Sequence, residues 1–273
     1  MLLSDTSRAL NVHRFGSGTE TVVLAHGFGS DQGTWKQLIP ALRRYRVVVY
    51  DLAGSSAADP AYFDLRQHED LEGHADDLIR ILGDQQVESC TIVGHSVSGV
   101  IALLAAIRRP DLFRKLILVG TSARYTDDAG YRGGLDPAHL QHTFTQIATN
   151  FREFALATCP GMVGKPADHP ATQSFLESVL RMRPDLVLSM AKAIFLSDYR
   201  DRLAECKVPA AILQTEYDPA VPLEAAQYLH AHLPNSTFEI IPAEGHHPHL
   251  TSPNLFAAAL RRHLPLMEAE LPG

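Results

Sequence analysis

The sequence predicts a doubly wound α/β fold, in which helices flank a mostly parallel, twisted sheet. Short apolar runs recur along the chain, and most are continuous rather than alternating, as in strands buried on both faces of a parallel sheet. Segments whose apolar residues repeat with the helical period lie between many of these runs. Strands that alternate with helices are typical of parallel α/β sheets, whose ligands bind at the carboxyl ends of the strands.

Six apolar runs are predicted to be strands, and a seventh run is weaker. The six are residues 21–25, 46–50, 89–93, 115–119, 210–215 and 237–241, and the weaker run is residues 9–15. Residues 71–82 place apolar side chains on one helical face, and residues 223–233 and 255–264 follow the same pattern. No internal repeat or low-complexity linker interrupts this order.

The alternation breaks between about residues 125 and 203, where no strand pattern recurs. Helical stretches are predicted there near 137–150, 151–158, 171–181 and 184–196, separated by loops rich in Pro and Gly. A helical insertion between the sixth and seventh strands is expected to lie above the strand ends as a cap. The alternative is a helical subdomain with no part in the site, although insertions of this size above a binding edge are usually functional.

Composition limits the classes of function. The chain has 273 residues, 45% of them hydrophobic and 20% charged, which is typical of a globular enzyme. Its net charge of −7 gives no attraction to nucleic acid or anionic lipid. Three separated cysteines, with no C-x-x-C pair, predict no disulfide framework and a reduced, cytoplasmic setting. We see no signal-peptide pattern and no run of about 18 apolar residues that would predict a transmembrane helix.

Ser96 is the first candidate catalytic residue. It lies in Gly94-His95-Ser96-Val97-Ser98, between a short apolar strand and an apolar helix. A serine on such a tight strand-to-helix turn is typical of the nucleophile elbow of α/β-hydrolases, although Ser98 stands where that pattern has its second Gly. The alternative is a strand-to-helix turn with an incidental serine.

A serine nucleophile needs a base, and the base needs a carboxylate that orients it. In the hydrolase pattern the acid and then the histidine follow the serine along the chain. Asp218 lies in the loop after the strand at 210–215 and is the predicted acid, with Glu216 as its competitor.

The predicted base is His246, the first side chain after the bend at Gly245. His247 and His249 are neighbours that leave the assignment open. Three histidines could also indicate a metal, but the helical pair or second cluster that zinc sites need is missing here, so we expect no metal.

Two backbone N–H groups are predicted to form an oxyanion hole. One belongs to Val97, directly after the nucleophile, and the other to Phe28 in the loop His26-Gly27-Phe28-Gly29. The alternative for that loop is a plain glycine-rich turn.

Taken together, these residues resemble the RsbQ-like α/β-hydrolases, which include a bacterial sigma-B stress regulator and the plant strigolactone and karrikin receptors. The similarity spans nearly the whole chain. Besides the segments above, it rests on Asp31-Gln32, Trp35, Asp59-Pro60-x-Tyr62-Phe63-Asp64, Leu71-Glu72-Gly73, Arg109-Pro110-Asp111-Leu112-Phe113, Arg124-Tyr125, Met182-Arg183-Pro184-Asp185, Phe195-x-Ser197-Asp198, Asp218-x-Ala220-Val221-Pro222 and Gly245-His246.

The resemblance implies a Ser96–His246–Asp218 triad without a cofactor, and a V-shaped four-helix cap at 125–201 on a core of 1–124 and 202–273. It also implies an apolar pocket for a small lactone or enol-ether ligand. The pocket residues it implies are Phe28, His95, Val97, Tyr125, Phe175, Ile194, Phe195 and Ala220. Leu135 and Thr158 stand where the receptors tend to carry aromatics, which predicts a wider pocket, and the loop at 51–56 also departs from the family pattern.

The leading functional hypothesis is a cofactor-free serine hydrolase that cleaves a small ester, lactone or enol ether through an acyl-enzyme. The alternative is a signalling module whose ligand binding or slow hydrolysis regulates a partner, which in RsbQ-like systems would be a phosphatase with a sensor domain. Haloalkane dehalogenation is disfavoured because it needs a carboxylate at position 96. Perhydrolase chemistry would keep the serine triad, but no residue selects for it.

Overall fold

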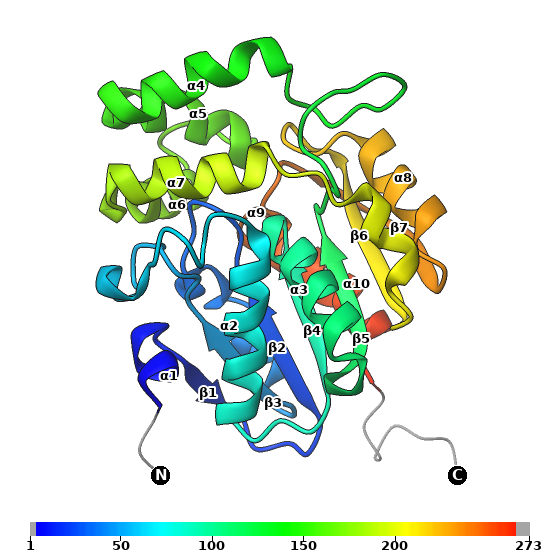
Figure 1. The fold of residues 1–273 in the computed structure, drawn as a ribbon. Helices are drawn as coiled ribbons and strands as arrows, with labels where there is room; N and C mark the ends of the chain where they lie inside the picture. The colour runs from blue at the N-terminus through cyan, green and yellow to red at the C-terminus, as the bar shows by residue number, and fades with distance from the viewer. Residues whose placement is uncertain (1–3, 266–273) are drawn as a thin grey trace.

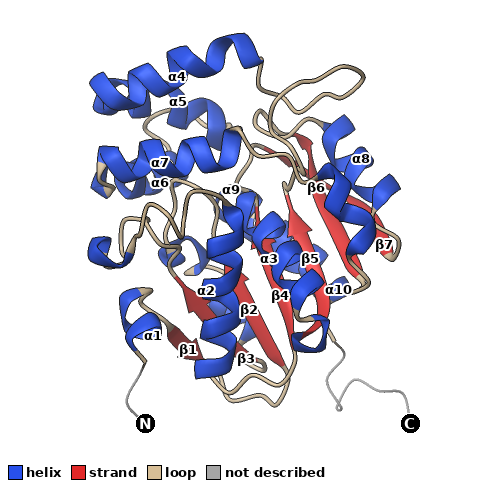
Figure 2. Cartoon of the chain, viewed as in Figure 1, coloured by secondary structure: helices blue, strands red, loops and turns tan. Residues whose placement is uncertain are grey.

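The computed structural model describes residues 4–265, which form one seven-stranded sheet with helices on both faces (Figures 1 and 2). The strand order is β1-β3-β2-β4-β5-β6-β7, with β1 antiparallel to β3 and all other pairs parallel. The strands are β1 His13–Phe15, β2 Thr21–Ala25, β3 Arg46–Tyr50, β4 Cys90–His95, β5 Phe113–Val119, β6 Ala210–Tyr217 and β7 Ser236–Glu244. The predicted doubly wound α/β fold is confirmed.

The inner strands are continuous apolar runs because both of their faces are buried. All five residues of β2 are buried, and Val23 pairs in register with Val48 of β3 and Ile92 of β4. Alternate residues of these strands point into two separate hydrophobic clusters, one on each face of the sheet. The clusters therefore hold the sheet between two layers of helices.

One face of the sheet is covered by α2 Leu71–Asp84, α3 Val97–Arg108 and α8 Leu223–His232, with α1 Asp5–Ala9 at its edge (Figure 1). The other face packs against α10 Pro253–His263, with α9 Pro248–Thr251 beside it, and against Trp35 and Leu42. Short 3-10 turns complete the layers: η1 Gln32–Trp35, η2 Ile39–Leu42, η3 Pro60–Tyr62, η4 Pro110–Leu112 and η5 Arg200–Glu205.

Four further helices lie over the carboxyl ends of the strands (Figure 2). They are α4 Pro137–Thr149, α5 Phe151–Val163, α6 Pro170–Arg181 and α7 Pro184–Phe195, and α4 packs on α7 while α5 packs on α6. This layer lies between β5 and β6, the fifth and sixth strands of the described chain, rather than between a sixth and a seventh strand. The predicted runs also place the insertion after the fifth of seven strands, so only the strand numbers given for it were wrong.

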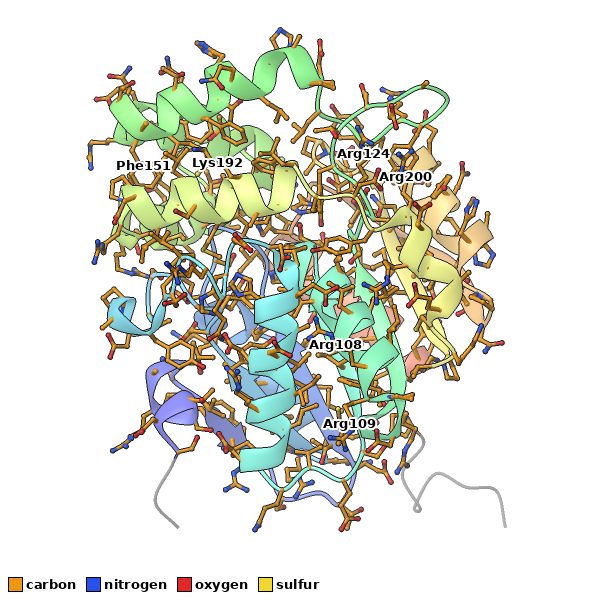
Figure 3. All side chains as sticks on the ribbon, viewed as in Figure 1. Arg108, Arg109, Arg124, Phe151, Lys192 and Arg200 are labelled. Carbon is orange, nitrogen blue, oxygen red and sulfur yellow. The ribbon has the colours of Figure 1, made fainter. Side chains whose placement is uncertain are left out.

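Two arginines join the segments that connect this helical layer to the sheet (Figure 3). The Nη1 atom of Arg124 lies 2.8 Å from Asp198 and 3.0 Å from Asp128. The Nη2 atom of Arg200 lies 2.7 Å from each of the same two carboxylates. Burial acts to raise the pKa of Asp198, but the arginine hydrogen bonds outweigh it and lower that pKa to about 2. The network therefore ties the outgoing and returning chain together.

Within residues 4–265, no helix is long and apolar enough to cross a membrane.

Gly245 allows the loop after β7 to pass directly against the end of α5. Its φ is +89°, and a Cβ at this position would lie 2.1 Å from the carbonyl oxygen of Val163. The next residue, His246, donates its backbone N–H to the Met162 carbonyl at 3.0 Å. The loop that carries His246 is thus attached to the helical layer through its backbone.

We predict that Gly245→Ala lowers the free energy of unfolding by about 2–4 kcal/mol, because it combines left-handed backbone with a steric clash. The matched control is Gly83→Ala on α2, where an added Cβ meets nothing within 4 Å. That change should stabilise the protein by roughly 0.5–1 kcal/mol, as expected inside a helix. Urea denaturation of both variants measures the difference, and equal stabilities would show that the close approach at Gly245 has no energetic consequence.

Candidate active site

Ser96 occupies a sharp turn between β4 and α3. Its backbone has φ 56° and ψ −124°, a conformation that non-glycine residues rarely adopt. Its N–H donates to the Val119 carbonyl at 2.8 Å, which holds the turn against the end of β5. Such strain persists only where the surroundings enforce it, and here it places the serine at the carboxyl edge of the sheet.

Ser98 fills the position where the elbow pattern has a second glycine. Its side chain is fully buried, and its hydroxyl donates to the His26 carbonyl. The serine therefore replaces the missing glycine with a hydrogen bond that joins the elbow to the loop at 26–29. The departure from the pattern leaves the tight turn intact.

His246 and Asp218 form a buried pair. The His246 Nδ1 atom lies 2.8 Å from Oδ2 and 3.0 Å from Oδ1 of the carboxylate, and the two side chains are only 4% and 1% exposed. Backbone N–H groups of Ala220 and Val221 donate to Oδ1 at 2.8 and 3.0 Å, so the carboxylate is held as an acceptor. Nδ1 therefore carries the proton, which leaves Nε2 with its lone pair.

Glu216, the competing acid, is exposed near the end of β6 and does not enter this pair. The difference arises because Glu216 still belongs to the strand, whereas Asp218 begins the turn that bends back over the sheet edge.

Ser96 and the His246–Asp218 pair both lie against the end of β5. A Cβ on Gly120 would lie 3.2 Å from both Asp218 Oδ2 and His246 Nδ1. Gly120 directly follows Val119, the residue that accepts the Ser96 N–H. The structure thus brings together all three residues that were predicted to form the triad, from the ends of β4, β6 and β7.

Three buried histidines, His95, His247 and His249, surround His246. The His95 ring lies 4.7–4.9 Å from those of the other three. Its Nε2 donates to the His246 carbonyl at 2.7 Å, and His249 Nε2 lies 2.8 Å from Thr34 Oγ1. Burial lowers the pKa of His95, His247 and His249 well below the usual histidine value, so all three rings are neutral.

His95 was predicted to line the ligand pocket, but its ring lies beneath His246, and the residues that line the cavity described below do not include it. The sequence signal that could have indicated this packing is the density of histidines in 245–249, which was considered only as a choice of base or as a metal site.

The two predicted oxyanion donors lie beside Ser96. Val97 is the first residue of α3, so its N–H is among the helix N-terminal groups without an intrahelical acceptor. On the other side, a Cβ on Gly27 would lie only 3.1 Å from Ser96 Cβ, which shows how closely the loop carrying Phe28 approaches the serine. Both backbone N–H groups therefore belong to segments that lie against Ser96.

An apolar cavity of about 230 Å³ lies under the four helices and reaches the loop of Phe28 and Gly29. Phe28, Phe175 and Phe195 line it, as do Leu135 and Thr158, the two positions expected to widen the pocket. The other predicted pocket residues, Val97, Tyr125, Ile194 and Ala220, belong to the hydrophobic cluster or pack against it instead of lining this cavity.

Tyr125 links the cavity to the serine. Its ring meets Phe195 edge-on, with centroids 6.3 Å apart. Burial raises the pKa of its phenol, and the nearby Ser96 side chain acts against that rise.

The family model of the alpha/beta hydrolase family matches residues 22–259. The chain belongs to this family. It is 43% identical to a karrikin insensitive 2 receptor of Petunia hybrida over 258 residues, which cover 94% of this chain and 96% of the relative. It is 40% identical to a strigolactone esterase of Arabidopsis thaliana, with 94% and 97% of the two chains covered. The resemblance to this branch of the α/β-hydrolases is confirmed.

Solved structures agree with this assignment. A hydrolase from Oleispira antarctica superimposes with a TM-score of 0.90 at 32% identity and covers 95% of this chain and 96% of its own. The similarity includes the helical layer, because it extends over nearly the full length of both chains.

We predict that Thr158→Phe partly fills the cavity and weakens binding of an apolar fluorescent probe, N-phenyl-1-naphthylamine, by roughly tenfold, or about 1.4 kcal/mol. Thr158 lines the cavity, and its hydroxyl only donates to the Phe154 carbonyl within α5. The control is Thr149→Phe on α4, an exposed threonine with the same hydrogen bond to the residue four before it. Equal affinities of the two variants would contradict a binding role for this cavity.

Proposed function

We propose that the protein is a serine hydrolase of small apolar esters or lactones, with Ser96 as nucleophile, His246 as base and Asp218 as the orienting acid. The observation that carries the proposal is the strained turn at Ser96 beside the buried His246–Asp218 pair. A metal or cofactor has no step in this chemistry, since the serine is activated by the adjacent base.

In the proposed reaction, Ser96 is first acylated by the substrate and then released by water. His246 Nε2 takes the Ser96 proton as Oγ attacks the substrate carbonyl, and the oxyanion accepts hydrogen bonds from the Val97 and Phe28 N–H groups. The protonated imidazole, stabilised by Asp218, then gives its proton to the leaving alkoxide, and an acyl-serine remains. Water, deprotonated by His246, hydrolyses the acyl-enzyme and restores the serine.

The apolar cavity in the helical layer favours a small apolar substrate. We propose that residues 125–201 act as a cap on a core of 1–124 and 202–273, so that the cavity holds the substrate and excludes water. The relatives are named as a receptor of the karrikin insensitive type and as a strigolactone esterase, which favours a small lactone-type ligand here as well. A cytoplasmic location stays a prediction from the cysteine pattern.

The receptor names of relatives at about 40% identity favour a second function, in which the bound ligand regulates a partner protein such as a sensor phosphatase. The two functions share one site and differ in turnover. Steady-state kinetics with lactone and aryl esters separates them: hydrolysis through many cycles favours an enzyme, whereas one slow turnover with a retained product favours signalling.

Replacing Ser96 should abolish ester hydrolysis. We expect Ser96→Ala to lower kcat on a p-nitrophenyl ester by about 10⁴-fold or more, as triad removals do. A fluorophosphonate probe should label the wild type on Ser96, which mass spectrometry of the peptide can verify. Ser98→Ala, two residues away, should still be labelled. Near wild-type turnover of Ser96→Ala would overturn the proposed function.

The acid is assigned by a pair of isosteric changes. Asp218→Asn should keep the fold but lower kcat on the order of 10⁴-fold, because an amide that donates to Nδ1 stabilises the wrong tautomer. Glu216→Gln should leave kcat unchanged, because that side chain is exposed on β6. The opposite pattern in steady-state kinetics would make Glu216 the acid.

The base is assigned in the same way. His246→Ala should be inactive, whereas His247→Phe should keep a substantial fraction of the wild-type kcat, because the neutral, buried His247 ring packs at an angle of 48° against Phe175 with centroids 4.3 Å apart. Circular dichroism confirms folding of both variants. If His247→Phe is the inactive one, the base lies one residue further along.

A further inference from the structure

A second polar cluster is buried away from Ser96, between α2 and the loop that precedes it. His74 and Asp77 lie three residues apart on α2, so they project from the same face of the helix. His68 joins them from the loop. A ring nitrogen of each histidine and a carboxylate oxygen of Asp77 all lie within 4.8 Å of one another, and the three residues are 1–3% exposed.

The Asp77 carboxylate is oriented so that one oxygen faces the histidines. Oδ1 accepts hydrogen bonds from Tyr62 Oη at 2.9 Å, Gln67 Nε2 at 3.0 Å and Arg80 Nη1 at 3.2 Å. Oδ2 lies 2.9 Å from His68 Nε2. The three donors on Oδ1 hold the group in place and leave Oδ2 with lone-pair capacity toward the cluster.

The Nδ1 atom of His68 has a hydrogen-bond partner in either tautomer. With a proton on Nε2, it donates to Asp77 Oδ2 and its Nδ1 accepts from the Asp64 N–H at 3.1 Å. With a proton on Nδ1, it donates to the Asp64 carbonyl at 3.0 Å and presents the Nε2 lone pair to the cluster. The second arrangement is the one found in metal sites, where a ligating histidine donates its other N–H to a carbonyl.

His74 is the unsatisfied member. Among the described residues, its Nδ1 atom has no hydrogen-bond partner although it is buried, and the same holds for the hydroxyl of Tyr50. The cluster therefore contains a buried imidazole nitrogen without a partner in residues 4–265, and a neutral imidazole nitrogen is a common metal ligand.

We propose that His68, His74 and Asp77 bind a divalent transition metal, with Zn²⁺ as the best match to two imidazoles and one carboxylate. Bonds of about 2.1 Å at angles of 90–109° separate two ligand atoms by about 2.9–3.4 Å. The 2.9 Å between His68 Nε2 and Asp77 Oδ2 already matches this range. The ion would displace the Nε2 proton, and His74 would close on it from within 4.8 Å.

Such an ion would be structural. Phe63 stacks on His68 with ring centroids 4.9 Å apart, and both Phe63 and Met190 of α7 pack against Gly54. A metal bound to His68 and α2 would therefore fix the loop on which the helical layer rests. This site is independent of the proposed ester chemistry, so either proposal can fail without the other.

The test uses the whole chain. EDTA first removes any bound metal, and Co²⁺ is then added stepwise as a probe of the His68–His74–Asp77 site. We expect one equivalent to give visible ligand-field absorption bands, which Zn²⁺ removes and Mg²⁺ does not. Zn²⁺ at 100 times its Kd should also stabilise the fold, because it binds only the native site. His68→Phe and His74→Phe should each lower the Co²⁺ affinity at least 100-fold.

The control is His139→Phe, an exposed histidine beside Asp136 on α4, which should bind Co²⁺ as the wild type does. Circular dichroism reports whether each variant is folded. If His74→Phe does not fold, X-ray absorption of the Zn²⁺-loaded wild type decides, and two imidazole ligands are expected. The proposal is overturned if the wild type binds no saturable equivalent of Co²⁺, or if both cluster variants bind Co²⁺ with unchanged affinity. It is also overturned if the ligands around the bound Zn²⁺ include no imidazole. Each of these results would favour a buried water between the three side chains.

Discussion

The backbone of Ser96 is the constraint on which the candidate site depends. A φ of 56° in a non-glycine residue is unfavourable, and it is maintained because β4, α3 and the end of β5 all determine the path of the chain there. The hydrogen bond from Ser98 to the His26 carbonyl adds the loop at 26–29 to the same turn. One strained residue thus sets the relative positions of the serine and of both candidate oxyanion donors.

The base is held by packing as much as by its carboxylate. His246 receives a hydrogen bond from His95 at its carbonyl, donates its own N–H to α5, and presents Nδ1 to Asp218. The pKa values of the neighbouring histidines are lowered by burial, so these rings are neutral and add no positive charge beside His246. Polar rings in this layer support the catalytic geometry without taking part in the proton transfer proposed here.

The helical layer and the loops of the site are mechanically connected. Met162 of α5 accepts the His246 N–H and also lines the apolar cavity. The ion-pair network of Arg124 and Arg200 joins the two connecting segments near the sheet. A ligand that fills the cavity therefore contacts the same helix that holds the loop of the base, which fits both hydrolysis and ligand-dependent signalling.

Local patterns in the sequence were sufficient for most of the fold and for the three proposed catalytic residues. Buried parallel strands appear as apolar runs, and the residues that follow them must meet at one edge of the sheet, so Ser96, Asp218 and His246 could be placed together. The strands at β4, β6 and β7 extend further than predicted because polar residues at their ends still pair with neighbours. Only residues 13–15 of the weak run at 9–15 form a strand, because residue 9 still belongs to α1, whose first turn is capped by Ser4.

Only the tertiary structure decided which side chains share an environment. The His95 ring donates to the His246 carbonyl, because the loop after β7 packs against the end of β4, 151 residues earlier in the chain. Phe28, Phe175 and Phe195 line the cavity, whereas Tyr125 and Ile194 do not. Which side chains line a cavity depends on the rotation of each helix about its own axis, and tertiary packing determines that rotation. His74 and Asp77 share a helical spacing of three residues, but His68 has no such spacing with either of them. Their convergence depends on a loop folding onto α2, which no local pattern encodes.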